Sequence, residues 1–129
     1  MNGAKLFSSL LMFLFLIMAA RVSVAAQKGD PKAGKAGYDL LCGSCHGASG
    51  KGDGPAAASL PAKPQTLADG KYMNNLTDQH LFSVIKGGGA SVGKSPLMPP
   101  WGSQLGDQDI WNLVSYIRSM AIPPYKPAK

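Results

Sequence analysis

The pattern of apolar and polar positions predicts two amphipathic helices in the second half of the chain. The last of them has apolar residues at i, i+3, i+4, i+7 and i+10. They are Ile110, Leu113, Val114, Ile117 and Met120. This helix should begin near Asp107 and end before Pro123-Pro124. A middle helix should follow the cap Thr77-Asp78 and stop at the glycines of residues 87–89. Its apolar side is formed by Leu81, Phe82, Val84 and Ile85.

A third helix is predicted earlier, from Pro31 to the first cysteine. Asp30 suits its N-cap, and proline is favoured at the first helical position. Gly34, Gly37, Tyr38 and Leu41 recur at helical spacing, and glycines on a buried face indicate a close crossing with another helix. Residues 47–64 should form a loop, and residues 67–75 at most a short helical turn. Because no stretch alternates with the period of a strand, we expect an all-α domain.

The first 26 residues match a secretory signal peptide. Lys5 supplies the positive charge, residues 6–20 are largely apolar, and small residues follow at positions 23–26. Cleavage after Ala26 or Ala25 fits the preference for small residues at the cut. The apolar run is shorter than the roughly 18–20 residues of a spanning helix, although an uncleaved N-terminal anchor is the alternative. We expect export to a bacterial periplasm, with residues 27–129 as one domain and no membrane span after cleavage.

The expected mature chain of 103 residues is small and rich in turn-forming residues, with fifteen glycines and ten prolines. Too few aliphatic residues remain for a large core. Without Lys5 and Arg21 it has eleven basic residues against seven aspartates, a net charge of +4. The lysines are scattered and not interleaved with aromatic residues, which argues against nucleic-acid binding. A moderate positive charge instead suits an acidic protein partner.

Cys42-Gly43-Ser44-Cys45-His46 is a C-x-x-C-H motif that contains both cysteines of the chain. This spacing is the attachment signature of c-type haem. Two thiols can each add to one vinyl group of the porphyrin, and His46 then serves as the proximal iron ligand. A buried porphyrin would also supply the apolar surface that the sequence lacks.

This motif has three alternatives to haem attachment: a zinc site, a redox motif and a structural disulfide. A zinc site normally needs four ligands, and only His80 is left to join these three. A thioredoxin-like redox motif needs a βαβ context, which the pattern does not show. A disulfide between residues three apart would close a very short loop and stabilise little.

The second axial ligand has four candidates, namely His80, Met73, Met98 and Met120. Met98 lies between prolines in Ser95-Pro96-Leu97-Met98-Pro99-Pro100-Trp101, where the backbone should be stiff and extended. A weak thioether–iron bond benefits from such a pre-positioned ligand. The alternative for Met98 is a packing role in a buried loop.

These features together resemble a class I c-type cytochrome, of the small soluble bacterial kind associated with respiratory oxidases. Gly34 and Tyr38 match the family's first helix, and Leu113 and Tyr116 match the last helix that crosses it. The resemblance implies a small cytochrome c fold, with loops wrapped around one covalent haem. It also implies that the carbonyl of Pro55, in Gly54-Pro55, accepts a hydrogen bond from the proximal imidazole.

The resemblance implies one-electron transfer with His46/Met98 ligation between redox proteins, and no enzymatic activity. Two alternatives are a haem subunit dedicated to one oxidase or dehydrogenase, and a sensor or peroxidase in which Met98 dissociates. We expect a monomer. Lys51, Lys86 and Lys94 flank the two haem-contacting segments and are candidates for a basic surface facing an acidic partner.

Overall fold

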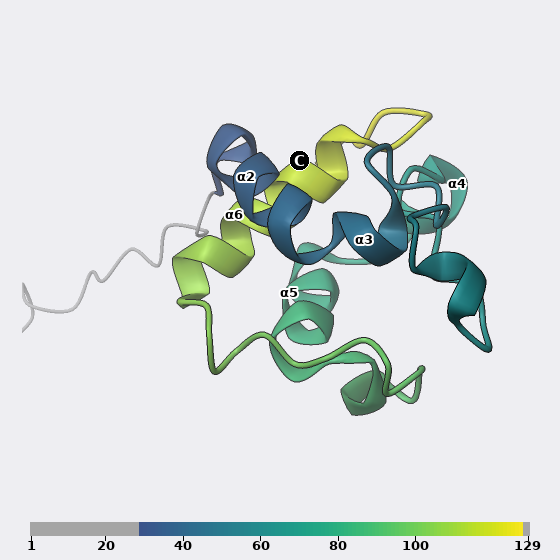
Figure 1. Cartoon of the computed structure of the whole chain (residues 1–129). Helices are drawn as coiled ribbons and strands as arrows, with labels where there is room; N and C mark the ends of the chain where they lie inside the picture. The colour runs from purple at the N-terminus through teal and green to yellow at the C-terminus, as the bar shows by residue number, and fades with distance from the viewer. Residues whose placement is uncertain (1–28, 128–129) are drawn as a thin grey trace, which may run out of the picture.

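The computed structural model describes residues 29–127 and confirms an all-α fold (Figure 1). Its α-helices are α2 (Pro31–Leu41), α3 (Gly43–His46), α4 (Gly70–Met73), α5 (Asp78–Gly87) and α6 (Asp107–Ser119). Two 3₁₀ turns, η1 (Ala57–Ser59) and η2 (Gly89–Val92), complete the regular structure. The described residues contain one isolated β-bridge, between Asp69 and Ile122, and no strand. The predicted signal peptide lies outside the described residues, so it stays a prediction.

The helices begin where the sequence places their caps. The Asp30 side chain accepts a hydrogen bond from the backbone N–H of Lys32 at the start of α2. Thr77 does the same for the N–H of His80 at the start of α5. Each cap satisfies a backbone donor that has no partner inside its helix. The boundaries of the three long helices are therefore those that the sequence predicts.

Helices α2 and α6 cross closely, as Figure 1 shows in blue and yellow-green. The crossing is centred on Gly34, where a β-carbon would lie 1.9 Å from the carbonyl oxygen of Asn112. Next to it, Tyr38 is fully buried and meets Tyr116 edge to face, with 5.1 Å between ring centroids. The predicted crossing of the terminal helices is thus confirmed.

The hydrophobic core fills the space between this crossing and α5. It joins the buried faces of α2, α5 and α6 with two residues from the segment around α4. Its members are Tyr38, Leu67, Met73, Leu81, Phe82, Ile85, Ile110, Leu113, Val114 and Ile117. Met120 packs against this cluster, as its place on the apolar stripe of the last helix predicts.

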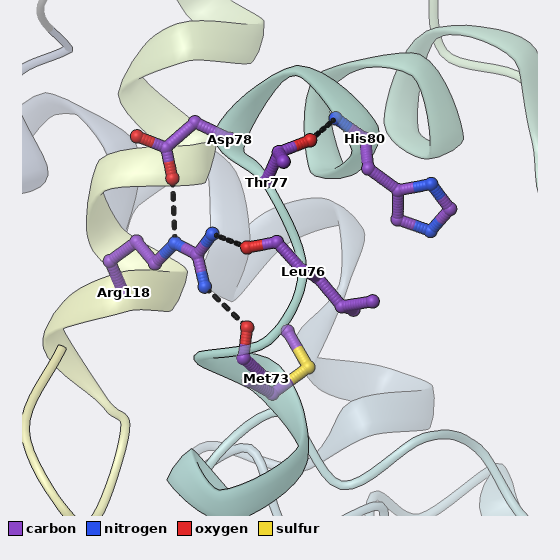
Figure 2. Close-up of polar contacts among 6 residues, drawn as sticks. All are labelled: Met73, Leu76, Thr77, Asp78, His80 and Arg118. Atoms are coloured by element: carbon purple, nitrogen blue, oxygen red, sulfur yellow. Dashed lines mark hydrogen bonds and ion pairs between the residues drawn. The ribbon is translucent and has the colours of Figure 1, made fainter. Parts of the chain in front are cut away.

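A buried arginine ties α6 to the connection between α4 and α5 (Figure 2). The Arg118 side chain donates to the carboxylate of Asp78 at 2.7 Å, to the carbonyl of Met73 at 2.6 Å and to that of Leu76 at 2.5 Å. Its guanidinium lies 3.9 Å from the ring centroid of Tyr125. Each of the three guanidinium nitrogens makes one of these hydrogen bonds, which offsets part of the cost of burying the charge. The helical pattern alone gave no sign of this role for Arg118.

The crossing generates a stability prediction. Replacing Gly34→Val should lower the free energy of unfolding by about 1–3 kcal/mol or more, because the new side chain meets backbone that cannot move aside. Gly37→Ala is the matched control on the same helix, since a β-carbon there would lie 3.4 Å from Leu113 Cδ2, an ordinary contact. That control should stabilise the helix by about 0.5–1 kcal/mol. Chemical denaturation of both variants tests this, and equal stabilities would contradict it.

Candidate haem site

The C-x-x-C-H motif is folded into a single helical turn directly after α2. The backbone N–H of Cys42 donates to the carbonyl of Tyr38, and the N–H of His46 donates to that of Cys42. Residues at i, i+3 and i+4 share one face of a helix. The turn therefore brings Cys42, Cys45 and His46 to the same cavity.

This cavity has a volume of about 370 Å³, in the range of cofactor and ligand sites. Residues from the end of α2, from the C-x-x-C-H motif, from residues 60–65, from α5 and from the segment after α5 line it. They are Leu41, Cys42, Cys45, His46, Leu60, Ala62, Lys63, Pro64, Gln65, Val84, Gly89, Lys94, Ser95, Leu97, Met98, Pro99 and Trp101. No aspartate is among them. The lining is mainly apolar, with two thiols, an imidazole and a thioether, which fits a porphyrin and its iron.

Met98 is the one candidate for the second axial ligand that lines this cavity. Met73 is 2% exposed and belongs to the hydrophobic core, and Met120 packs against that core. His80 lies in the first turn of α5, and Figure 2 shows its ring beside that helix, away from the Arg118 cluster. The geometry therefore brings Met98 together with the C-x-x-C-H motif and leaves the other three candidates outside.

The imidazole of His46 is oriented by a carbonyl oxygen. His46 Nδ1 lies 3.0 Å from the carbonyl oxygen of Gln65. A carbonyl can only accept, so Nδ1 carries the proton and the lone pair of Nε2 is free to bind a metal. Burial lowers the pKa of His46, although the bond to Gln65 raises it in part. The net lowering of the pKa favours the neutral imidazole that a metal ligand requires.

The predicted partner of that imidazole was wrong, because Gln65 occupies the place assigned to Pro55. Pro55 is exposed and does not line the cavity. The N–H of Gly54 donates to the carbonyl of Cys45, and the N–H of Ala56 donates to that of Ser44, so this turn folds back onto α3. The chain reaches the imidazole ten residues later, directly after Pro64. Pro64, a later proline of the same loop, was the signal available in the sequence.

The two cysteines do not have the features of a redox or zinc site. Burial, followed by the charge of Cys45, raises the pKa of the Cys42 thiol to about 11. Reactive redox cysteines instead have a lowered thiol pKa. Within residues 29–127, no group of three or more histidine, cysteine or acidic side chains could hold a metal ion by itself.

Comparison with known proteins defines the class to which this fold and site belong. The family model described as Cytochrome c matches residues 31–121, so the chain belongs to the cytochrome c family. Cytochrome c-554(547) of Halothiobacillus neapolitanus is 34% identical over 96 residues, which cover 71% of this chain and 98% of that protein.

Two solved structures agree. A chain of the Kuenenia stuttgartiensis reducing HAO-like protein complex Kustc0457/Kustc0458 is 30% identical with a TM-score of 0.58, over 70% of this chain and 43% of that one. Cytochrome c6 from the diatom Phaeodactylum tricornutum is 27% identical with a TM-score of 0.50, over 69% of this chain and 91% of that one.

These matches confirm a class I c-type cytochrome. The cofactor is haem c, an iron porphyrin that is covalently bound to the protein, and the function is electron transfer. None of the helices among residues 29–127 has the length and apolar character needed to cross a membrane.

Proposed function

We propose that this protein is a periplasmic one-electron carrier in which Cys42 and Cys45 attach haem c and His46 and Met98 are the axial ligands. One observation supports this proposal above all others. The thiols, the imidazole and the thioether come from two segments far apart in the sequence, yet they line a single cavity. Export is supported by the signal-peptide pattern of residues 1–26. We infer a monomer with a redox protein as its partner.

Haem c, when bound, supplies an iron that gains and loses one electron. The protein's own residues set the conditions for this exchange. Gln65 holds the His46 ring and fixes its tautomer through the Nδ1 proton. The thioether of Met98 favours the ferrous state and raises the potential. Apolar side chains such as Leu60 and Leu97 reduce the access of water. No side chain is assigned acid–base or nucleophilic chemistry, so we propose that the protein is not an enzyme.

The attachment prediction can be tested by mass. The exported protein should exceed the mass of its polypeptide by one haem, and that haem should resist extraction into acidified butanone. Cys42→Ser/Cys45→Ser should remove the covalent mass, because no thioether can then form. A wild-type haem that extracts into butanone, or a wild-type protein without haem, would sink the assignment.

The ligand prediction compares two single variants. Met98→Ala should abolish the sulfur–iron absorption band and lower the midpoint potential. Axial ligands set haem potentials over a range of about 0.8 V, so the fall should be measurable. His80→Ala should leave both unchanged, because His80 does not line the cavity. Visible spectra and redox titration of the two variants give the answer, and the reverse pair of results would indicate bis-histidine ligation.

A basic surface at the cavity supports an acidic redox partner. Lys94, one of the three predicted lysines, lines the cavity, and so does Lys63, which was not among the predicted three. Of the other two, Lys86 is paired with Asp107 at 2.7 Å, and Lys51 does not line the cavity. Leu97 beside them is 54% exposed. We therefore propose that Lys63 and Lys94 flank an apolar contact surface for the partner.

This surface predicts a salt-dependent reaction. The bimolecular oxidation rate should fall several-fold as salt rises, since the Debye length shrinks from about 10 Å at 0.1 M to about 3 Å at 1 M. Lys63→Glu/Lys94→Glu should flatten that dependence and leave the haem spectrum unchanged. Lys32→Glu/Lys71→Glu is the control, because it makes the same change in net charge away from the cavity. This variant should keep most of the salt dependence of the rate. A wild-type rate indifferent to salt would contradict electrostatic steering.

A further inference from the structure

The segment that carries Met98 is bound to the C-terminal end of α5. The last carbonyls of a helix have no partner within it. Here the carbonyl of Ile85 accepts from the backbone N–H of Trp101, and that of Lys86 accepts from the N–H of Gly102, both at 3.0 Å. The end of α5 thus anchors the chain a few residues after Met98.

Gly89, two residues beyond α5, holds the segment on the other side of Met98. Its backbone N–H donates to the carbonyl of Met98 at 3.0 Å, and its carbonyl accepts from the N–H of Lys94 at 2.9 Å. A β-carbon on Gly89 would lie 2.1 Å from the carbonyl oxygen of Ser95 and 3.3 Å from Met98 Cβ. Backbone cannot yield as a flexible side chain does, so any side chain at this position must displace the segment.

We propose that Gly89 is a positioning residue for the Met98 thioether. Because Gly89 has no side chain, the backbone of Met98 can lie in direct contact with it. This contact sets how far the thioether reaches into the cavity, and therefore the strength of the sulfur–iron bond. This inference rests on the proposed ligation by Met98. A thioether is an uncharged and weak iron ligand, so no strong electrostatic attraction compensates for a displaced backbone. The sulfur–iron bond therefore depends on where the backbone is placed.

The test is Gly89→Ala in the haem-loaded protein. The sulfur–iron band should be lost or strongly weakened and the midpoint potential lowered, while covalent haem and helical circular dichroism remain. Gly93→Ala is the matched control in the same segment. Gly93 has a positive φ, of 69°, so alanine there strains its own backbone, but its β-carbon would meet nothing within 4 Å and would not press on the segment. The control should keep the band. A Gly89→Ala protein with wild-type band and potential would overturn the inference.

A double-variant comparison separates positioning from general stability. In a Met98→Ala background, Gly89→Ala should leave the potential unchanged, because no thioether remains to be placed. A further fall of the potential in that background would overturn the positioning role. If the single variant Met98→Ala kept the band, the proposed ligation itself would fail, which is a different outcome.

A measurement on the unaltered protein covers the case in which Gly89→Ala does not fold. Imidazole added to the ferric protein competes with the thioether for the iron. If the two are linked as proposed, the amide of Gly89 should then exchange its hydrogen faster, because its acceptor is the Met98 carbonyl. The amide of Met73, which donates to Asp69 within the α4 turn, is the internal control. Unchanged exchange at Gly89 on imidazole binding would overturn the inference.

Discussion

The rest of the structure depends on the close contact between α2 and α6 at Gly34, and Tyr38 extends that contact into the haem site. The Tyr38 ring packs against Tyr116 of α6, and its hydroxyl donates to the carbonyl of Gly47 at 2.8 Å, directly after His46. A buried hydroxyl is costly without a partner, so the α3 turn is held in one position relative to the crossing. Burial also raises the pKa of Tyr38, which keeps this hydroxyl protonated as the donor. Helix packing and cofactor binding therefore share one side chain.

The cavity adjoins a small hydrophobic core. Protein interiors are packed as densely as organic crystals and contain few voids larger than a water molecule. A mainly apolar space of about 370 Å³ next to so small a core needs a large apolar occupant. Haem c meets this need, and it would bury its porphyrin against Leu60, Leu97 and Trp101. Burying the apolar surface of the porphyrin would stabilise the fold.

Helix α5 supports the site from both of its ends. Near its start, Asp78 is bound by Arg118 of α6, which also holds the carbonyls that precede the helix (Figure 2). At its end, the free carbonyls hold the segment that follows Met98. The position of Met98 therefore depends, through α5, on α6, the helix that crosses α2. The two proposed axial ligands, His46 and Met98, come from different parts of the chain, yet the contacts that hold both segments lead back to α2 and α6.

The sequence by itself determined the features that depend on near neighbours. The spacing of Cys42, Cys45 and His46 places them on one helical face, and the caps Asp30 and Thr77 start their helices, because these effects act within a turn or two. The apolar periodicity of residues 110–120 was sufficient for the same reason. Only the tertiary structure decided which carbonyl meets His46, which lysines reach the cavity and what Arg118 binds. The contacts of Gln65 and Arg118 span 19 to 45 positions of sequence, and Lys63 reaches the cavity from the same loop as Gln65. Their contacts depend on how the intervening loops fold back. The Gly54-Pro55 turn returns to α3 before the chain reaches the imidazole, so the residues of a turn do not by themselves determine the path of a loop.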